Sequence, residues 1–127
     1  MTPALHPEPL GLTIGPVQYW WPRHELFDFY ARLVDSAADT FVLGEVVCSR
    51  RHEIKLDDWL ALAADLAAAG KRVVLATQAL VMSEAELRSV RRLCEQDGWQ
   101  VEANDASALG LLDRQGAARP FVIGPHC

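Results

Sequence analysis

Short apolar segments alternate with helical patterns along most of the chain. Five such segments have the length of buried strands, and they cover residues 12–15, 40–44, 72–77, 99–104 and 120–124. Their hydrophobic residues run continuously instead of alternating, which is typical of strands in a parallel sheet that is covered on both faces. Because parallel strands need a crossover connection, usually a helix, this order predicts an α/β fold of repeated βα units.

The segments between these strands repeat their apolar residues with the 3.6-residue period of an α-helix. The string SEAE at residues 83–86 is a capping box, which predicts that a helix begins there. Asp57 is expected to cap the preceding helix, and Asp105 or Ser107 the following one. The positions expected to face the core are Leu26, Phe29, Tyr30, Leu33, Val34 and Ala37, then Trp59, Leu62, Ala63 and Leu66, then Leu87, Val90 and Cys94, and finally Leu109 and Leu112.

A series of parallel βα units forms either an open doubly wound sheet or a (β/α)8 barrel. No GxGxxG motif follows the first strand, so a dinucleotide-binding fold is not supported. A complete barrel needs about 250 residues, whereas this chain has 127 and ends after a fifth strand with no helix to follow. We therefore predict the N-terminal half of a TIM-like barrel over residues 11–127, truncated on its C-terminal side, with residues 1–10 as a flexible lead-in.

Composition narrows the class of protein. No apolar run approaches the roughly 20 residues of a membrane-spanning helix, and the start MTPALHPEPLG lacks the features of a secretory signal. The three cysteines are widely spaced and odd in number, which argues against a disulfide framework and favours a cytoplasmic protein. The net charge is −5 and the basic residues are scattered, so nucleic acid is not expected as the main partner.

Polar and reactive side chains follow the predicted strands at the ends where each strand stops. Parallel α/β folds bind their ligands at the carboxyl ends of the strands, so these residues are expected on one rim. The candidates for a pocket on this rim are Tyr19, Glu45, Cys48, Arg50, Arg51, Glu102 and Asn104.

Cys48 is the most informative of these candidates. It follows the second strand in the stretch LGEVVCSRR, close to Arg50 and Arg51. Neighbouring guanidinium groups favour the thiolate form, which is both a nucleophile and a ligand for soft metals. The alternative is a small buried hydrophobic residue, and that is the role expected for Cys94 on the apolar face of its helix.

The other candidates have structural alternatives of equal weight. Glu45 either belongs to the pocket or pairs with a neighbouring arginine, and Tyr19 with its two tryptophan neighbours forms either a pocket wall or packing beneath a loop. Glu102 alternates with Val101 and points either into the barrel mouth or away from it. No nucleophile–base pair, P-loop or CxxC pair is found, so the sequence identifies no catalytic residue.

Two motifs carry a resemblance to a known family. LTIGPVQYWWPRHELFDFY begins at residue 12 and contains GPVQYWWP, and DTFVLGEVVCSRRHEIKLDDW begins at residue 39 and contains LGEVVCSRR. These motifs, with GKRVVLATQALV and VEANDASALGLL further along, resemble the ubiquinone-biosynthesis members of the collagenase-like peptidase family. The resemblance covers about residues 12–126.

The resemblance implies an iron–sulfur subunit. Members of this branch hold a [4Fe–4S] cluster through four cysteines and work as a heterodimer with a UbiU-like subunit and a UbiT-like lipid-binding protein. Together they hydroxylate ubiquinone precursors without molecular oxygen, with prephenate as the hydroxyl donor. Cys48 matches the first cluster cysteine, and Arg50 and Arg51 would offset the negative charge of the cluster.

The same resemblance places the other three ligands in a part of the family's chain that this sequence does not contain. Cys94 and Cys127 do not occupy those positions. We therefore expect that the 127-residue chain alone does not hold a stable cluster. The alternatives are a hydrolase like other members of the family, an RNA hydroxylase, or an inactive fragment.

Overall fold

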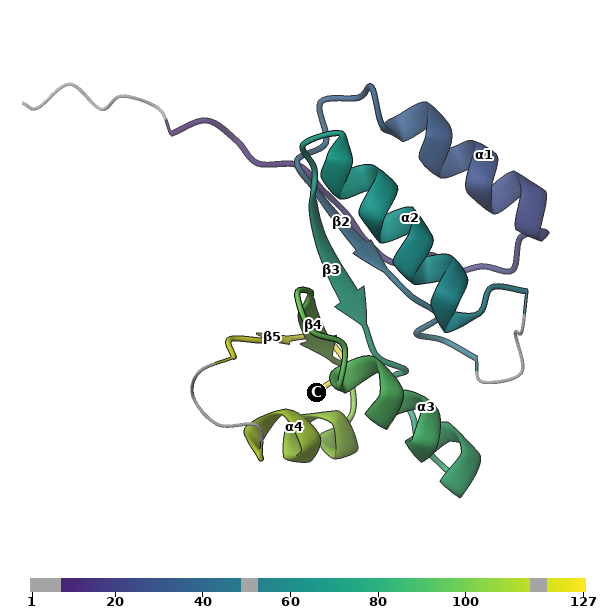
Figure 1. Cartoon of the computed structure of the whole chain (residues 1–127), viewed down its shortest axis with the longest axis vertical. Helices are drawn as coiled ribbons and strands as arrows, with labels where there is room; N and C mark the ends of the chain where they lie inside the picture. Colours follow the sequence, from purple (N-terminus) through teal and green to yellow (C-terminus); the bar gives the residue numbers. More distant parts are fainter. Residues whose placement is uncertain (1–7, 49–52, 115–118) are drawn as a thin grey trace, which may run out of the picture.

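The computed structural model describes residues 8–48, 53–114 and 119–127. Strands and helices alternate throughout these ranges (Figure 1). The elements are β1 (Thr13–Ile14), α1 (Arg23–Leu33), β2 (Thr40–Leu43), α2 (Leu56–Ala68), β3 (Arg72–Ala76), α3 (Glu84–Cys94), β4 (Gln100–Ala103), α4 (Ala106–Asp113) and β5 (Val122–Ile123). All five predicted strands and all four predicted helices are therefore present, although each strand is shorter than its apolar run.

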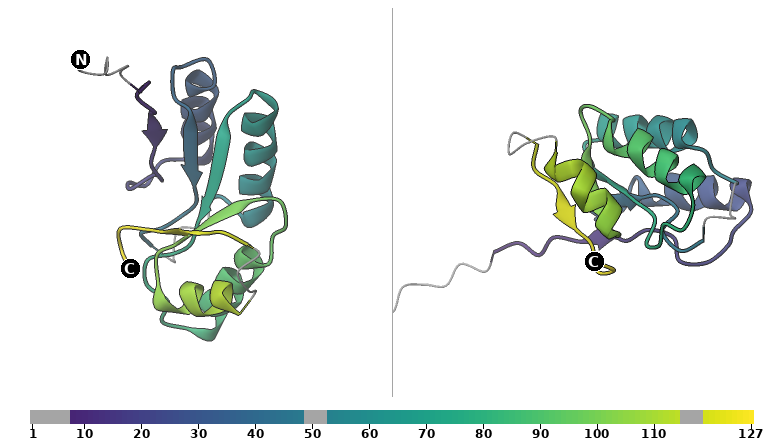
Figure 2. Two further views of the ribbon diagram at one scale, coloured as in Figure 1. Left: turned by 90° about the vertical axis from the view of Figure 1, so that its left-hand side faces the viewer. Right: turned by 90° about the horizontal axis from the view of Figure 1, so that it is seen from below.

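The strands form one parallel sheet in the order β1-β2-β3-β4-β5. Every strand therefore pairs with its neighbour in sequence, as in a barrel and not as in a dinucleotide-binding sheet, where the order reverses. The sheet curls, and the helices lie along its outer side (Figure 2). This arrangement confirms the predicted α/β fold of repeated βα units, curled like half of a TIM-like barrel.

The pairing register explains why all four helices share one face of the sheet. Leu43 pairs with Leu75, and Leu75 pairs with Val101, so these side chains point to the same side. Leu43 and Leu75 belong to a core cluster with residues of α1 and α2, whereas Val101 packs with residues of α3 and α4. A doubly wound sheet would place helices on both sides, so that alternative is excluded.

The inner face of the sheet carries a separate apolar cluster formed by Val42, Val46, Val74 and Ala76, with Val122 packed against it. The sequence predicted a sheet covered on both faces, and both faces of the sheet carry buried apolar residues, the outer face against the helices and the inner face in this cluster. The inner residues are buried because the sheet curls and brings them against one another, which satisfies the same apolar pattern without a second helical layer.

The periodicity of the sequence located much of the buried face of the helices, although Ala37, expected to face the core, is exposed and its neighbour Ala38 is buried instead. In α2 the buried residues are Trp59, Leu62, Ala63 and Leu66, as predicted. The Ser83 side chain accepts the N–H of Glu86 at 3.2 Å, and Glu86 Oε2 accepts the N–H of Met82 at 2.6 Å, so a cap forms where the SEAE string predicted one.

The start of α2 differs from the expectation. Asp57 lies in the first turn and does not cap the helix, because the N-cap position is Lys55. Asp58, three residues after Lys55, accepts the Lys55 backbone N–H at 3.0 Å. A carboxylate at this position satisfies an otherwise unpaired donor and also favours the positive end of the helix dipole.

Two basic side chains bind backbone carbonyl oxygens near the amino-terminal ends of the strands. Lys71 Nζ donates to the carbonyl oxygens of Ser36 at 2.9 Å and Ala38 at 2.8 Å. Arg119 donates to three carbonyl oxygens at the end of α3 and beyond, those of Cys94, Gln96 and Trp99. These contacts give hydrogen-bond donors to carbonyl oxygens at and after the ends of α1 and α3. The side chains at the amino-terminal ends of the strands therefore stabilise the fold.

Among the described residues, no helix combines the length and apolar character needed to cross a membrane.

Candidate functional site

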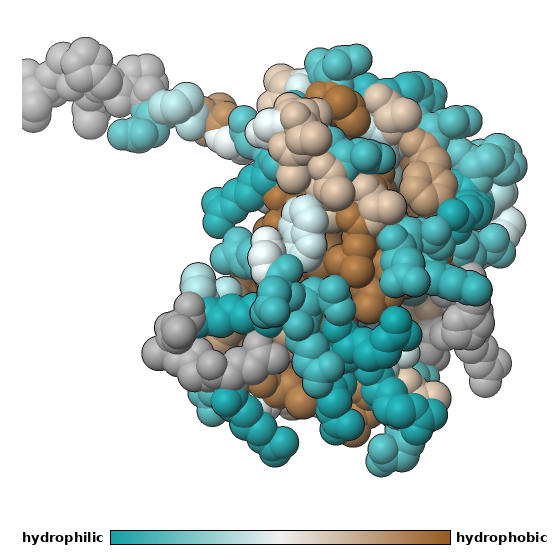
Figure 3. Space-filling model, in the orientation of Figure 1, coloured by the Kyte–Doolittle hydropathy of each residue, from teal (hydrophilic) through white to brown (hydrophobic). Residues whose placement is uncertain are grey.

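A cleft lies at the carboxyl ends of β2 and β3, beside the first turns of α2 and α3. Its volume is about 720 Å³, which falls in the range of small-molecule sites. The lining includes Gly44, Glu45, Cys48, Thr77, Gln78 and Ser83. In the view of Figure 3, apolar residues gather over β3 and the adjoining part of α2, while mainly polar residues lie over α3. We refer to this space as the Cys48 cleft.

Gly44 allows the chain to turn from β2 into the cleft. Its φ angle is +150°, and a Cβ atom built on it would lie 2.5 Å from the carbonyl oxygen of Ala76 in the neighbouring strand. A residue with a side chain would therefore strain the backbone and push β2 away from β3. This requirement explains the glycine in the LGEVVCSRR stretch.

Cys48 lies in the loop after β2, and its side chain is half-buried at the cleft. Glu45 Oε1 accepts the backbone N–H groups of Val47 at 3.0 Å and Cys48 at 3.1 Å. The N–H of Ala79, in the loop after β3, donates to the carbonyl oxygen of Val46 at 2.9 Å. The backbone on the amino-terminal side of Cys48 is thus fixed by its own loop and by the next one.

Glu45 was expected either to belong to the pocket or to pair with a neighbouring arginine. This carboxylate accepts hydrogen bonds from two backbone N–H groups of its own loop. Arg50 and Arg51 lie outside the described residues, so their pairing with Glu45 and their approach to Cys48 stay predictions.

Tyr19 lies at the same rim but not in the Cys48 cleft. Its side chain is 78% exposed and lines a smaller cavity together with Trp20, Trp21 and Glu45. Trp21 packs edge-to-face on Phe29 with ring centroids 5.0 Å apart, so one member of the aromatic cluster packs against α1. The aromatic stretch therefore combines both of the roles considered for it.

Glu102 and Asn104 form a second polar group near the end of β4. Glu102 pairs in register with Ala76 and Val122, which places it on the inner face of the sheet. Asn104 is fully buried, and its Nδ2 donates to Glu102 Oε1 at 3.0 Å and to the carbonyl oxygen of Thr77 at 3.2 Å. Neither Glu102 nor Asn104 lines the Cys48 cleft, although Thr77 contributes to both groups.

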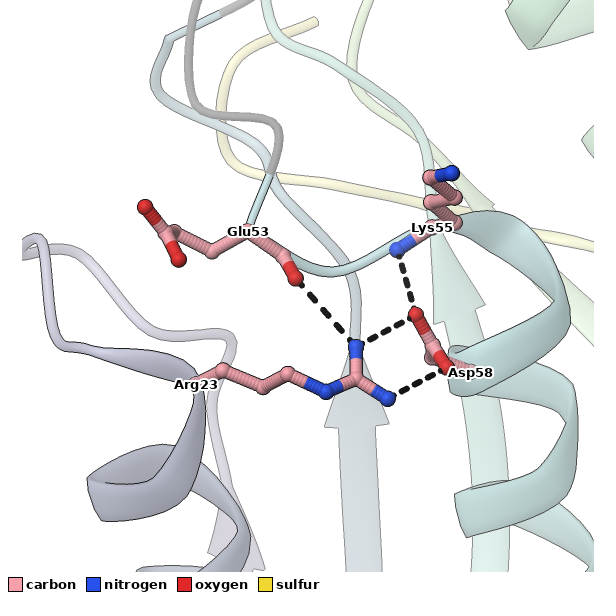
Figure 4. Close-up of polar contacts among 4 residues, drawn as sticks. All are labelled: Arg23, Glu53, Lys55 and Asp58. Atoms are coloured by element: carbon pink, nitrogen blue, oxygen red, sulfur yellow. Dashed lines mark hydrogen bonds and ion pairs between the residues drawn. The ribbon is translucent and has the colours of Figure 1, made fainter.

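Two residues that the sequence did not single out stabilise the part of the cleft wall that precedes and begins α2. Arg23, at the start of α1, forms a bidentate ion pair with Asp58 in the first turn of α2 (Figure 4). The two residues are 35 positions apart, and no local pattern connects them. The only signal in the sequence was the placement of an arginine and an acidic residue after adjacent strands.

Among the described residues, the thiols do not form a complete ligand set for an iron–sulfur cluster. Cys94 is the last residue of α3 and is fully buried in the core, and burial raises the pKa of its thiol to about 11, so it stays protonated at neutral pH. Cys127 Sγ donates to the carbonyl oxygen of Ala103 at 3.1 Å. A [4Fe–4S] cluster needs four ligands, and the cleft contains one thiol.

The carboxylates and histidines of the described residues do not form a metal site either. Within residues 8–48, 53–114 and 119–127, no group of three or more His, Cys, Asp or Glu side chains is placed to hold a metal ion. The described residues therefore do not form a complete cluster site.

Comparison with models of protein families finds no family that matches the chain, and no solved structure matches it.

Proposed function

We propose that the chain is part of a UbiV-like iron–sulfur subunit that acts in the oxygen-independent hydroxylation of ubiquinone precursors. In this proposal Cys48 is one of four ligands to a [4Fe–4S] cluster. The observation that carries the proposal is the position of Cys48: a half-buried thiol that lines a cleft at the carboxyl ends of parallel strands. Barrel enzymes bind their ligands at this rim.

The geometry around Cys48 suits a metal ligand better than a residue that only fills space. Its backbone N–H is held by Glu45, and the preceding carbonyl oxygen of Val46 is held by Ala79. A ligand with a fixed main chain loses little conformational entropy when it binds a metal. The resemblance places the three remaining ligands in a part of the family's chain that these 127 residues do not contain, so the 127-residue chain alone is not expected to hold the cluster.

The proposed partners follow from the resemblance of residues 15–22 and 43–51 to the ubiquinone-biosynthesis branch of the collagenase-like peptidase family. They are a UbiU-like subunit, a UbiT-like lipid-binding protein, the ubiquinone precursor and prephenate. The proposal assigns no catalytic residue to this chain. Its role is to contribute a cluster ligand and part of a cleft.

Two competing functions have weaker support. A hydrolase would need a base beside Cys48, and the described residues that line the cleft include no histidine. An RNA hydroxylase would need a basic surface, whereas the chain has 12 basic against 17 acidic residues.

The proposal is tested in a cell that naturally makes the protein. Replacing the Cys48 codon by an alanine codon in the chromosome leaves the rest of the protein as the cell makes it. We expect ubiquinone to fall to the level of a deletion strain during anaerobic growth and to stay normal during aerobic growth.

The matched control is Cys127→Ala, which removes a cysteine whose side chain is exposed and which does not line the Cys48 cleft. This variant is expected to make normal amounts of ubiquinone in both conditions. If the Cys48→Ala strain makes normal anaerobic ubiquinone while the deletion strain does not, Cys48 is removed from the site.

A further inference from the structure

We infer that Arg23 is a positioning residue for Cys48: it fixes the part of the cleft wall formed by residues 54–57 and thereby sets the access of reagents to the thiol. The inference rests on the proposed function only in treating Cys48 as the reacting group. Arg23 does not itself line the Cys48 cleft, so it acts through the residues that it holds.

The contacts of Arg23 converge on one short segment (Figure 4). Its Nη1 donates to Asp58 Oδ2 at 2.6 Å, and its Nη2 donates to Asp58 Oδ1 at 2.7 Å. Nη1 also donates to the backbone carbonyl oxygen of Glu53 at 3.3 Å. Asp58 Oδ2 in turn accepts the backbone N–H of Lys55 at 3.0 Å. One guanidinium group therefore fixes Glu53 directly and Lys55 through Asp58.

The segment held in this way is a wall of the Cys48 cleft. Ile54, Lys55, Leu56 and Asp57 all line the cleft together with Cys48. Ile54 lies between the two backbone groups that are fixed by Arg23 and Asp58, so its place in the wall depends on both contacts.

Two parts of the cleft lining are fixed by different contacts. The backbone before Cys48 is held by Glu45 and by the hydrogen bond from Ala79 to Val46. Residues 54–57 are held to α1 by Arg23, directly at Glu53 and through Asp58 at Lys55. The Arg23 side chain also packs over the ring of Phe27, with its Cζ atom 4.9 Å from the ring centroid, and this contact restricts its rotamer.

The requirement is for arginine in particular. The planar guanidinium donates two parallel hydrogen bonds to the Asp58 carboxylate and a further one to Glu53, a pattern that the single ammonium group of lysine does not reproduce. Arg23→Lys therefore keeps the charge but loses the geometry, and Asp58→Asn keeps the shape but loses the ion pair.

The test measures how fast iodoacetamide alkylates each cysteine of the 127-residue chain, with each modified peptide counted by mass spectrometry. The three thiols report on different events. The alkylation rate of Cys48 measures access to the cleft. The rate of buried Cys94 measures unfolding of the whole chain, and the rate of exposed Cys127 measures the reactivity of the reagent itself. No iron is needed, so the result is independent of whether the proposed function is correct.

In Arg23→Ala and Asp58→Asn we expect the alkylation rate of Cys48 to rise roughly fivefold, as for the loss of one well-formed ion pair from a local opening equilibrium. The rates of Cys94 and Cys127 are expected to stay unchanged. Arg23→Lys should give an intermediate rise. The matched control is Lys71→Met, which removes a basic side chain with two carbonyl contacts at the opposite edge of the sheet and should leave Cys48 unaffected.

Either of two results would overturn the inference. An unchanged Cys48 rate in both Arg23→Ala and Asp58→Asn would show that the wall does not depend on these contacts. A parallel rise for Cys48 and Cys94 would show that Arg23 contributes only to the stability of the whole fold.

Discussion

The side-chain amide of Asn104 lies directly against the backbone of Gly124. A Cβ atom built on Gly124 would come within 2.0 Å of Asn104 Oδ1. Asn104 has no room to retreat, because it is fully buried and its Nδ2 is held by Thr77 and Glu102. The ends of β3, β4 and β5 are thus joined by one buried polar group and one glycine.

We therefore expect Gly124→Ala to destabilise the protein by about 1–3 kcal/mol, the usual cost of forcing extra atoms into a packed interior. Urea unfolding followed by circular dichroism measures this change. Gly110→Ala is the matched control, since no atom lies within 4 Å of a Cβ built there. Gly110 is inside α4, where alanine should stabilise by about 0.5–1 kcal/mol. Equal effects of the two substitutions would contradict the close contact at Gly124.

Tyr30 gives a second prediction, because its buried hydroxyl has no hydrogen-bond partner among the described residues. The side chain is fully buried between α1 and the sheet, and this burial raises the pKa of Tyr30. A buried polar group without a partner costs about 1–3 kcal/mol.

Removing that hydroxyl should therefore not destabilise the protein. We expect Tyr30→Phe to leave the free energy of unfolding unchanged or to raise it by about 1 kcal/mol, as measured by urea unfolding. A loss of stability of that size would mean that the hydroxyl makes a hydrogen bond in solution.

The Arg23–Asp58 pair predicts a defined dependence of stability on pH. The Arg23 guanidinium and, to a lesser extent, the Lys55 backbone N–H hold the pKa of Asp58 well below its ordinary value. A carboxyl whose folded pKa is lowered stabilises the fold above its unfolded pKa, which is about 3.9, and this stabilisation is lost as the pH falls towards the folded pKa.

The side chains of Arg23 and Asp58 are 49% and 24% exposed, so solvent screening keeps the contribution of the pair small. Asp58→Asn should therefore be slightly less stable than the parent chain at pH 7. The difference should shrink progressively below about pH 4. Urea midpoints measured from pH 2 to pH 7 would reveal it. A difference that stays constant across this range would show that the charge of Asp58 does not matter.

Local patterns in the sequence were sufficient to predict the elements and much of the core. The period of α2 identified all four of its buried residues, and the SEAE string located the start of α3. Both signals come from residues within one or two helical turns, so they do not depend on tertiary structure.

The contacts that position the site could not be predicted in the same way. Arg23 meets Asp58 across 35 residues, and the Asn104 contact with Gly124 depends on strand register. For the same reason Asp57 was assigned as the cap of α2, although Asp58 is the acidic residue whose carboxylate accepts the N–H at that helix start. Asp58 serves there because the helix has its N-cap at Lys55, and the same carboxylate also pairs with Arg23, which is distant in sequence.

The position of Cys48 on a rim was expected from the order of strands and loops. What the sequence did not reveal is that Glu102 and Asn104 belong to a different polar group from Cys48. Both sets follow strands of one sheet, but Cys48 faces the cleft beside α2 and α3, and Glu102 lies on the inner face.

The most direct test of the central claim is the iron content of protein isolated anaerobically from its native cells with its partners attached. We predict about four iron atoms per molecule for the unaltered protein and for Cys127→Ala, as a [4Fe–4S] cluster requires. For Cys48→Ala we predict a loss of most of this iron and of the associated visible absorption. A Cys48→Ala protein that keeps its full iron content and absorption would contradict the claim that this thiol holds the cluster.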